Sequence, residues 1–209
     1  MKIFYCLLAI AACVFLIYAM QVQGAPLMAI WFVLGLLCWI FMLGREIDRA
    51  MTRLPRWIIG RAMKTPYFHL DGYMERYWFF RIGKRGGGQS GPSPLFGARV
   101  HHILRSDDGR DFHDHPWPYL TIILAGGYWE VRPVLVDNVV SYTRRRWHGP
   151  GSVLLRRANS WHRLELPKGT TAWTLFATGP KVQPWGFLVG RKKVYWRDYL
   201  NVPAGVGED

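Results

Sequence analysis

The chain has 209 residues, which is long enough for one domain of ordinary size with an appendage. Its three cysteines, Cys6, Cys13 and Cys38, all lie in apolar runs, which excludes a disulfide framework and a thiolate zinc site. The formal net charge of +13 is compatible with nucleic-acid binding, but the sequence contains no recognised nucleic-acid-binding motif. We therefore do not expect nucleic acid as a partner.

Two charge-free runs open the chain. Residues 3–20 contain no Gly or Pro, and after the link QVQGA a second run continues to Arg45. Each run has about the 17 to 25 residues that a transmembrane helix needs. A cleaved signal peptide is the alternative for the first run, because it begins directly behind Lys2. We predict a two-helix transmembrane hairpin over residues 1–44.

A basic segment follows the second run, whereas the link between the runs carries no charge. Its charged residues are Arg45, Glu46, Asp48, Arg49, Arg53, Arg56, Arg61 and Lys64. By the positive-inside rule, this pattern predicts a multi-pass protein of the bacterial inner membrane whose soluble domain faces the cytoplasm. Residues 45–66 then form a basic juxtamembrane segment on the lipid bilayer, in which Pro55 would kink or end a helix.

From about Tyr67 the sequence changes to short bursts of aromatic and β-branched residues separated by turn-forming residues. This pattern is typical of strands, and no convincing amphipathic helix interrupts it. It predicts an all-β barrel or sandwich over residues 67–200 and a flexible tail over residues 201–209. Within it, YLTIILAGGYWEVRPV predicts a hairpin with Gly126 and Gly127 at the bend.

The stretch DFHDHPWPY, residues 111–119, is rich in side chains that can bind metal. His113 and His115 are two residues apart, so on a strand both imidazoles face one side while Asp114 faces the other. Two nitrogens alone do not make a metal site, and a third ligand has to come from elsewhere in the fold. His162, which opens another expected strand, is the candidate.

Two stretches resemble the motifs of the cupin superfamily. GSVLLRRANSWH, residues 151–162, has the spacing of the second motif, G(x)5PxG(x)2H, with Arg157 and Asn159 in place of the usual Pro and Gly. HDHPWPYLTIILAG has the spacing of the first motif, G(x)5HxH(x)3-4E(x)6G, with Tyr119 in place of Glu. The resemblance covers residues 67–199, and FHDHPW with a later RRAxxxHR is similar to small cupin-like proteins of bacteria and phages.

The resemblance implies a cupin fold, which is a double-stranded β-helix or jelly-roll barrel, here preceded by two transmembrane helices. It also implies that His113, His115 and His162 hold a divalent metal ion. Fe(II) is favoured because three-His members of the family often carry iron, and Zn(II), Ni(II) and Cu(II) are alternatives that neutral imidazoles also suit. Tyr119 stands where the family usually has a Glu ligand, and we assign it a catalytic role as proton donor or fourth ligand.

Other polar residues leave alternatives open. Asp111 either orients a ligand imidazole or lies in a solvated turn. Only one of His101 and His102 can face the interior, where we expect a hydrogen-bonded side chain rather than a ligand. Arg144–Arg146 with Trp147 either bind an anion or keep an exposed edge strand soluble. Four charged strand residues cannot be sorted without knowing the pairing: Glu130, Arg132, Arg156 and Glu165.

Three classes of function follow from these observations. The first is a metal-dependent, dioxygenase-like enzyme that acts on a small molecule in the barrel. The second is a non-catalytic module that binds a small molecule or a lipid headgroup, which the basic residues favour. The third, a nucleic-acid binder, has only the charge in its favour. The sequence leaves homo-oligomerisation open.

Overall fold

The computed structural model describes residues 14, 18, 27–67, 69–82, 96–107, 109 and 111–203. By its internal contacts the chain divides into two compact units, which meet between Leu54 and Pro55. Helix α2, Leu27–Ala62, begins in the first unit and ends in the second. The first apolar run, residues 3–20, lies outside the described residues except for Val14 and Tyr18.

The membrane topology expected from the sequence is not supported. Among the described residues, no helix combines the length and the apolar character that crossing a bilayer requires. This finding overturns the prediction of a multi-pass inner-membrane protein with a cytoplasmic domain, and it leaves the bilayer without support as a partner.

Of the two effects expected of Pro55, a kink or an end of the helix, the second does not occur. The helix continues through it to Ala62. Ile58 and Ala62 are one turn apart on the same face, and both are buried in a cluster with Tyr77 and Val100. Burial of this face stabilises the last turns of the helix and offsets the backbone hydrogen bond that the proline removes.

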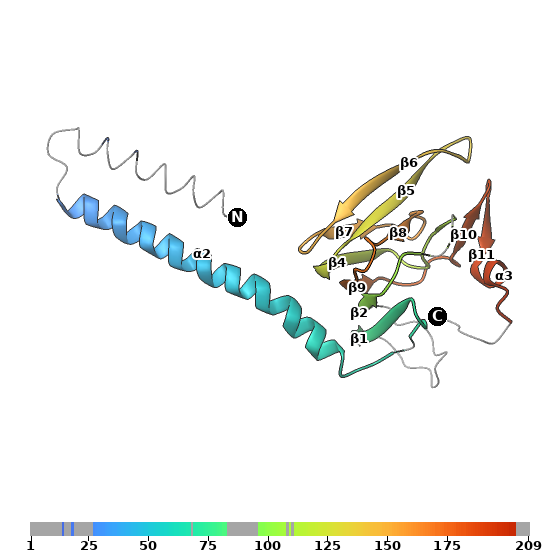
Figure 1. Cartoon of the computed structure of the whole chain (residues 1–209), viewed down its shortest axis with the longest axis horizontal. Helices are drawn as coiled ribbons and strands as arrows, with labels where there is room; N and C mark the ends of the chain where they lie inside the picture. Colours follow the sequence, from blue (N-terminus) through green and yellow to red (C-terminus); the bar gives the residue numbers. More distant parts are fainter. Residues whose placement is uncertain are drawn as a thin grey trace. The chain divides into compact units, whose positions relative to one another are not determined.

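The second unit is almost entirely β-structure (Figure 1), which confirms the all-β expectation for this part of the chain. A five-stranded sheet has the order β1-β2-β9-β4-β7, and two three-stranded sheets have the orders β11-β10-β3 and β6-β5-β8. The elements are β1 (Met74–Ile82), β2 (Phe96–Ile103), β3 (Phe112–His113), β4 (Tyr119–Gly126), β5 (Tyr128–Val136), β6 (Val139–His148), β7 (Val153–Arg156), β8 (Arg163–Glu165), β9 (Ala172–Thr178), β10 (Gly186–Val189), β11 (Lys192–Tyr195) and the helix α3 (Trp196–Leu200).

The main core lies between the five-stranded sheet and the β6-β5-β8 sheet. Ile103, Ile123 and Leu154 of the first sheet pack in one buried cluster with Tyr128 and Leu164 of the second. Burial of apolar side chains from two sheets in one cluster is the arrangement expected of a sandwich or a closed barrel.

The predicted hairpin across Gly126 and Gly127 is wrong, although both of its strands exist. β4 pairs with β7 and β9, whereas β5 pairs with β6 and β8. The two glycines therefore form a corner where the chain passes from one sheet to the other. Both have positive φ, +68° and +158°, and a Cβ on Gly126 would lie 2.0 Å from the carbonyl oxygen of Thr171.

The tight hairpin of this region lies between β5 and β6 instead. Asp137 and Asn138 form its turn with φ values of 50° and 61°, and the strands pair from Val136↔Val139 to Tyr128↔His148. Asp and Asn tolerate the left-handed region better than other residues with side chains, which explains how a two-residue turn forms here without glycine.

The two three-stranded sheets meet at a narrow backbone seam. His113 of β3 and His162, the residue before β8, form an isolated antiparallel bridge. Each residue donates its amide to the carbonyl oxygen of the other, at 2.9 and 3.0 Å. The bridge brings two histidines far apart in the sequence to directly opposed positions.

Candidate metal centre

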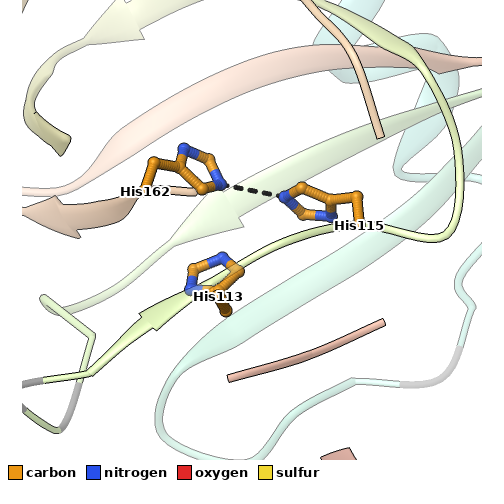
Figure 2. A group of neighbouring side chains, drawn as sticks. All are labelled: His113, His115 and His162. Atoms are coloured by element: carbon orange, nitrogen blue, oxygen red, sulfur yellow. Dashed lines mark hydrogen bonds between the residues drawn. The ribbon is translucent and has the colours of Figure 1, made fainter. Parts of the chain in front are cut away.

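His113, His115 and His162 converge, as the sequence predicted (Figure 2). Each offers one ring nitrogen to a set of three in which all atoms lie within 4.8 Å of one another. The ring centroids are 5.3 Å apart for His113 and His115, 4.7 Å for His113 and His162, and 5.1 Å for His115 and His162. The motif spacing therefore identified three side chains that share one location.

Two of these imidazoles come from one short stretch, the end of β3 and the two residues after it. His113 is held by its backbone bridge to His162, and the amide of His115 donates to the carbonyl oxygen of Ala158 at 3.0 Å. Asp114 faces the other way and is almost fully buried. Its carboxylate accepts hydrogen bonds from the amide of Gly186 at 2.8 Å and from the Lys193 ammonium at 2.5 Å. Asp114 thus points away from the two imidazoles, as predicted, and its contacts hold the stretch from the opposite side.

The environment keeps His113 and His115 in the form that binds metal. Burial lowers the pKa of His113 to about 4, although the nearby Asp107 opposes this shift. Burial, together with the neighbouring His162 and His113, lowers the pKa of His115 well below its usual value. Both imidazoles are therefore neutral at pH 7, and neutral imidazole is the ligand form of histidine.

The spacing of the ring nitrogens fits a bound ion. Nε2 of His115 and Nε2 of His162 lie 2.9 Å apart. Two imidazole nitrogens that each bind one ion at about 2.0–2.1 Å are roughly 3 Å apart when their bonds are near right angles. Without an ion, the same distance accommodates a proton shared between the two nitrogens. A donor set of three imidazole nitrogens suits Fe(II), Zn(II), Ni(II) or Cu(II).

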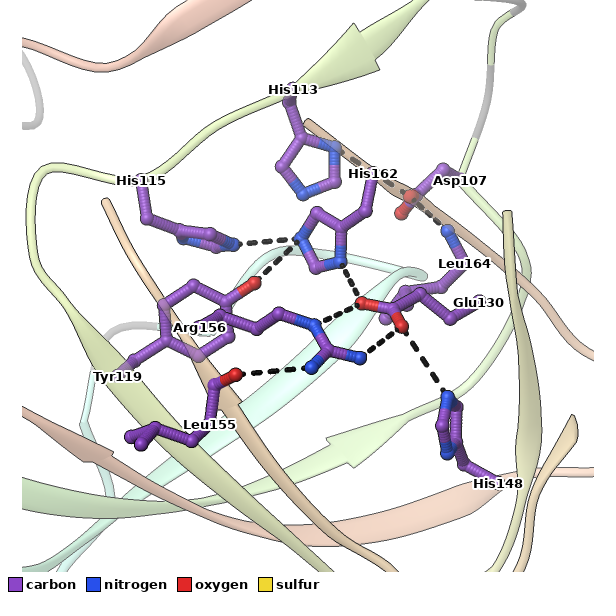
Figure 3. A network of polar contacts seen from close by, with 10 residues as sticks. All are labelled: Asp107, His113, His115, Tyr119, Glu130, His148, Leu155, Arg156, His162 and Leu164. Atoms are coloured by element: carbon purple, nitrogen blue, oxygen red, sulfur yellow. Dashed lines mark hydrogen bonds and ion pairs between the residues drawn. The ribbon is translucent and has the colours of Figure 1, made fainter. Parts of the chain in front are cut away.

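A buried carboxylate supports His162 from the far side of its ring (Figure 3). Oε1 of Glu130 lies 3.3 Å from Nδ1 of His162. Arg156 donates to both carboxylate oxygens, at 3.0 Å from Nε and 2.5 Å from Nη2. Nε2 of His148 lies 3.3 Å from Oε2. A carboxylate in this position favours the tautomer of His162 that leaves Nε2 free to bind a metal.

Glu130 is ionised despite its burial. Its side chain is 2% exposed, and burial by itself would raise its pKa. Its contacts with Nδ1 of His162 and with the guanidinium of Arg156 outweigh that effect and hold the pKa of Glu130 below its ordinary value. The bidentate contact from Arg156 is the geometry that best compensates a desolvated carboxylate.

Tyr119 lies beside the histidines, where the motif comparison put it. It is buried, and its hydroxyl lies 3.4 Å from Nε2 of His162. Its ring is 4.5 Å from that of His115 and 5.0 Å from that of Phe176. Burial and the negative charge of Glu130 raise the pKa of Tyr119 above its ordinary value, so the phenol keeps its proton.

Asp107 is a second carboxylate at the site. Its Oδ2 accepts the amide of Leu164 at 2.6 Å and lies 3.7 Å from Nδ1 of His113. Its Oδ1 accepts a hydrogen bond from Tyr73. Asp107 therefore faces the ring nitrogen of His113 that points away from the other two histidines, in the same relation as Glu130 to His162.

For Asp111 and for the pair His101 and His102, the structure shows contacts outside the three-histidine cluster. Oδ2 of Asp111 accepts a hydrogen bond from the hydroxyl of Tyr199 at 2.8 Å. His101 is the interior member of its pair and stacks on Phe176 at 5.0 Å. Its Nε2 is buried without a hydrogen-bond partner among the described residues, so the expected hydrogen bond is not found at that nitrogen. His102 faces the other side of the strand.

Sequence reasoning did not assign the residues that support the ligands. Glu130 and Arg156 were left among charged strand residues of unknown orientation, and the sequence analysis assigned no role to Asp107 or His148. The usable signal was the alternation in β5, where Glu130 shares a face with the buried Tyr128. That signal identifies a buried charge, but its partners come from β6, β7 and the segment before β8, which only the pairing reveals.

No protein-family model matches the chain, and no curated protein matches it. Solved structures similar to it include the hydroxypropylphosphonic acid epoxidase from S. wedmorenis, with 13% identity over 54% of this chain and 53% of that one and a TM-score of 0.39. The DMSP lyase DddQ from Ruegeria pomeroyi has 22% identity over 53% and 49%, with a TM-score of 0.34.

A cupin 2 conserved barrel domain protein from Rhodopseudomonas palustris has 14% identity over 57% of this chain and 72% of that one, with a TM-score of 0.36. The chain thus spans about half the length of the epoxidase and the lyase. Likenesses at this level assign no ligand or reaction to the chain.

Proposed function

We propose that residues 67–200 form a cupin-type barrel in which His113, His115 and His162 bind one divalent metal ion, with Fe(II) favoured. The observation that carries this proposal is the convergence of the three ring nitrogens within 4.8 Å. The lowered pKa values of His113 and His115 support it. The carboxylates behind His162 and His113 support it too, because carboxylates that contact the outer ring nitrogen are typical of metal-binding histidines.

The reaction that this site supports best is metal-dependent conversion of a small molecule, of the dioxygenase type. A bound divalent ion supplies a Lewis acid with open positions for substrate or oxygen. The chain supplies the orientation: Glu130 holds the ring of His162, and the backbone bridge holds His113. Buried aromatic rings, including Tyr119 and Phe176, exclude water from one side.

Tyr119 is the chain's candidate for proton transfer. Its phenol stays protonated at neutral pH, and its hydroxyl is 3.4 Å from the ligand nitrogen of His162. A protonated phenol can donate a hydrogen bond or a proton to a group bound among the histidines. No carboxylate among the described residues stands at the corresponding position, since Glu130 and Asp107 face the outer ring nitrogens.

A non-catalytic binding module is the second candidate. The observation in its favour is that Nε2 of His115 and Nε2 of His162 are close enough to share a proton, so the cluster is chemically complete without metal. In that case the barrel captures a small molecule, and the histidines act only as hydrogen-bonding groups.

Metal content of the purified full-length chain tests the proposal. We expect about one divalent ion per chain after anaerobic reconstitution with Fe(II), and near-complete loss of that ion in His162→Ala. The matched control is His102→Ala, which removes a histidine that stacks on Trp173 outside the cluster. Circular dichroism establishes that both variants fold.

Two results would count against the metal site. One is an equal metal content in His162→Ala and the natural chain, and the other is no stoichiometric metal in either. If metal binds, Co(II) substitution separates the two functions. A visible spectrum that changes on adding azide indicates open positions and favours the enzyme, whereas an unchanged spectrum favours the binding module.

A further inference from the structure

Strand alternation sorts the three consecutive arginines of β6 onto two faces. In the β5-β6 ladder, Arg144 stands opposite Arg132 and Arg146 stands opposite Glu130. Residues opposite each other in an antiparallel ladder project to the same face, and so do residues two apart on one strand. Arg132, Arg144 and Arg146 therefore share the face of Glu130, and Arg145 projects from the other.

Arg145 is already occupied on its own face. Its Nε donates to Oε2 of Glu165 at 2.9 Å, and its guanidinium lies over the ring of Trp129 at 4.2 Å. This ion pair and cation–π contact account for Arg145 as an ordinary surface residue with no ligand to bind. That explanation does not extend to its neighbours on the chain.

The face that carries Arg132, Arg144 and Arg146 is the face of β5 that contacts His162 of the proposed metal centre. The pairing of β5 with β8 ends at Val131↔Arg163, so in the same register Arg132 falls opposite His162. Glu130, on this face, touches His162 and His148. The positive charge of Arg132 also acts on the hydroxyl of Tyr119, whose pKa it lowers against the larger effect of burial.

Nothing in the described part of the chain neutralises these charges. Neither Arg132 nor Arg146 forms an ion pair there, and Arg144 contacts only the side chain of Tyr142, through a hydrogen bond of 3.2 Å and its ring. The carboxylate opposite Arg146, Glu130, is already paired with Arg156. All three guanidiniums are exposed. Arg132 and Arg144 face each other directly, and like charges so placed repel.

We propose that Arg132, Arg144 and Arg146 bind the anionic group, a carboxylate or a phosphate, of the small molecule that occupies the three-His site. The site then takes an anionic ligand, with the charged group on the arginines and the remainder directed toward the histidines. The position of the uncharged part of the ligand beside the histidines rests on the proposed function. Recognition of the anion itself needs only the guanidiniums, whose planar forks match both oxyanions.

Titration with inorganic phosphate tests the proposal on the full-length chain. The protein is stripped of metal with a chelator, desalted and followed by calorimetry at constant ionic strength. We expect saturable binding that weakens about tenfold in Arg132→Gln and in Arg146→Gln, as loss of a charge-assisted contact predicts. Arg145→Gln is the matched control, since it removes the same charge from the same strand and should bind like the natural chain.

Two outcomes would overturn the anion site. One is the absence of saturable phosphate binding by the natural chain. The other is equal weakening in all three variants, which would mean a general effect of net charge. Reloading part of each stripped preparation with Fe(II) and measuring its metal content keeps the two proposals separate: phosphate binding without metal uptake leaves the anion site standing, and metal uptake without phosphate binding leaves only the metal centre.

A lipid headgroup and a soluble molecule can present the same phosphate. Vesicles of phosphatidylcholine with and without phosphatidic acid distinguish the two sources. Vesicle binding that falls in Arg132→Gln but not in Arg145→Gln supports the anion site with a lipid-borne phosphate. Binding of soluble phosphate alone supports it with a soluble ligand. Binding of a short oligonucleotide that all three variants weaken alike, without phosphate binding, would contradict it.

Discussion

Glu130 is the residue that connects the buried polar side chains of the barrel. It is 2% exposed, and its carboxylate joins Arg156, His162 and His148 in one network (Figure 3). A buried charge with several partners contributes little net stability relative to an apolar core, but it is costly to break. Its position behind a ligand histidine makes the same side chain a test of both stability and metal binding.

Replacing Glu130 by Gln should separate these two effects. The substitution keeps the shape but removes the charge that compensates the part-buried Arg156, so we expect a loss of about 3 kcal/mol or more in the free energy of unfolding. We also expect metal affinity to fall by about 10- to 100-fold, because His162 loses the group that fixes its tautomer. Chemical denaturation and metal titration measure the two.

Glu165→Gln is the control for that substitution. Glu165 also accepts contacts from two arginines, Arg145 and Arg163, but its side chain is 31% exposed. A partly exposed pair is worth about 1 kcal/mol or less, and metal affinity should not change. A similar loss of metal affinity in both variants would show that Glu130 does not act through His162.

At this scale the sequence predicted that three histidines converge and missed the residues that contact their outer ring nitrogens. The three histidines were accessible because their spacing follows a motif and because alternation places His113 and His115 on one side. Glu130 and Arg156 could not be paired from the sequence, since their contact depends on which strands are neighbours. Tyr119 was correctly expected near the histidines, and its catalytic role remains a prediction.

Among the elements, the corner between β4 and β5 shows where local turn signals mislead. Two adjacent glycines favour a hairpin, yet the strands on either side of Gly126 and Gly127 belong to different sheets. The requirement for glycine here is steric, because a Cβ on Gly126 would meet the Thr171 carbonyl oxygen at 2.0 Å. The pattern located the turn, but it carried no information on how the strands pair.

Gly126→Ala should therefore destabilise the fold far beyond the cost of its backbone conformation. We expect a loss of about 3 kcal/mol or more, because neither backbone can move without breaking the β4-β9 ladder. Gly169→Ala is the matched control. Gly169 has a similar φ of +73°, with no atom within 4 Å of the added methyl, so only about 1 kcal/mol of conformational strain remains. Equal losses in urea denaturation would refute the steric explanation.

The end of α2 shows a second limit of local reasoning. Pro55 was expected to kink or end the helix, but the turns beyond it are buried through Ile58 and Ala62. Tertiary burial of an apolar face overrides a single unfavourable residue. The all-β character of this part of the chain, by contrast, was predicted, since it depends on short runs of local residues.

For the molecule as a whole, buried histidines link stability to pH. Burial, reinforced by the charges of Arg76 and Arg99, lowers the pKa of His101 well below its usual value. In the unfolded chain His101 then binds a proton near pH 6.5, whereas in the folded protein it stays neutral at that pH. The stability associated with neutral His101 is thus complete above about pH 6.5 and is lost as the pH falls below it.

We expect the free energy of unfolding, measured in urea with chelator present, to decline between pH 7 and pH 5. The decline should be smaller in His101→Gln, which has no proton to take up. Thr174→Val, at the position opposite His101 in the β2-β9 ladder, tests whether any core change has this effect. A decline of the same slope in His101→Gln and the natural chain would exclude His101 as a source of the pH dependence.

The backbone bridge between His113 and His162 has a consequence for how the site opens. The two amides that close the seam between the β6-β5-β8 and β11-β10-β3 sheets belong to two of the candidate ligands. Separation of these sheets and dispersal of the ligands are therefore one event. Hydrogen exchange at just these two amides would report the opening directly, and an ion held between the side chains would slow it by closing the seam from within.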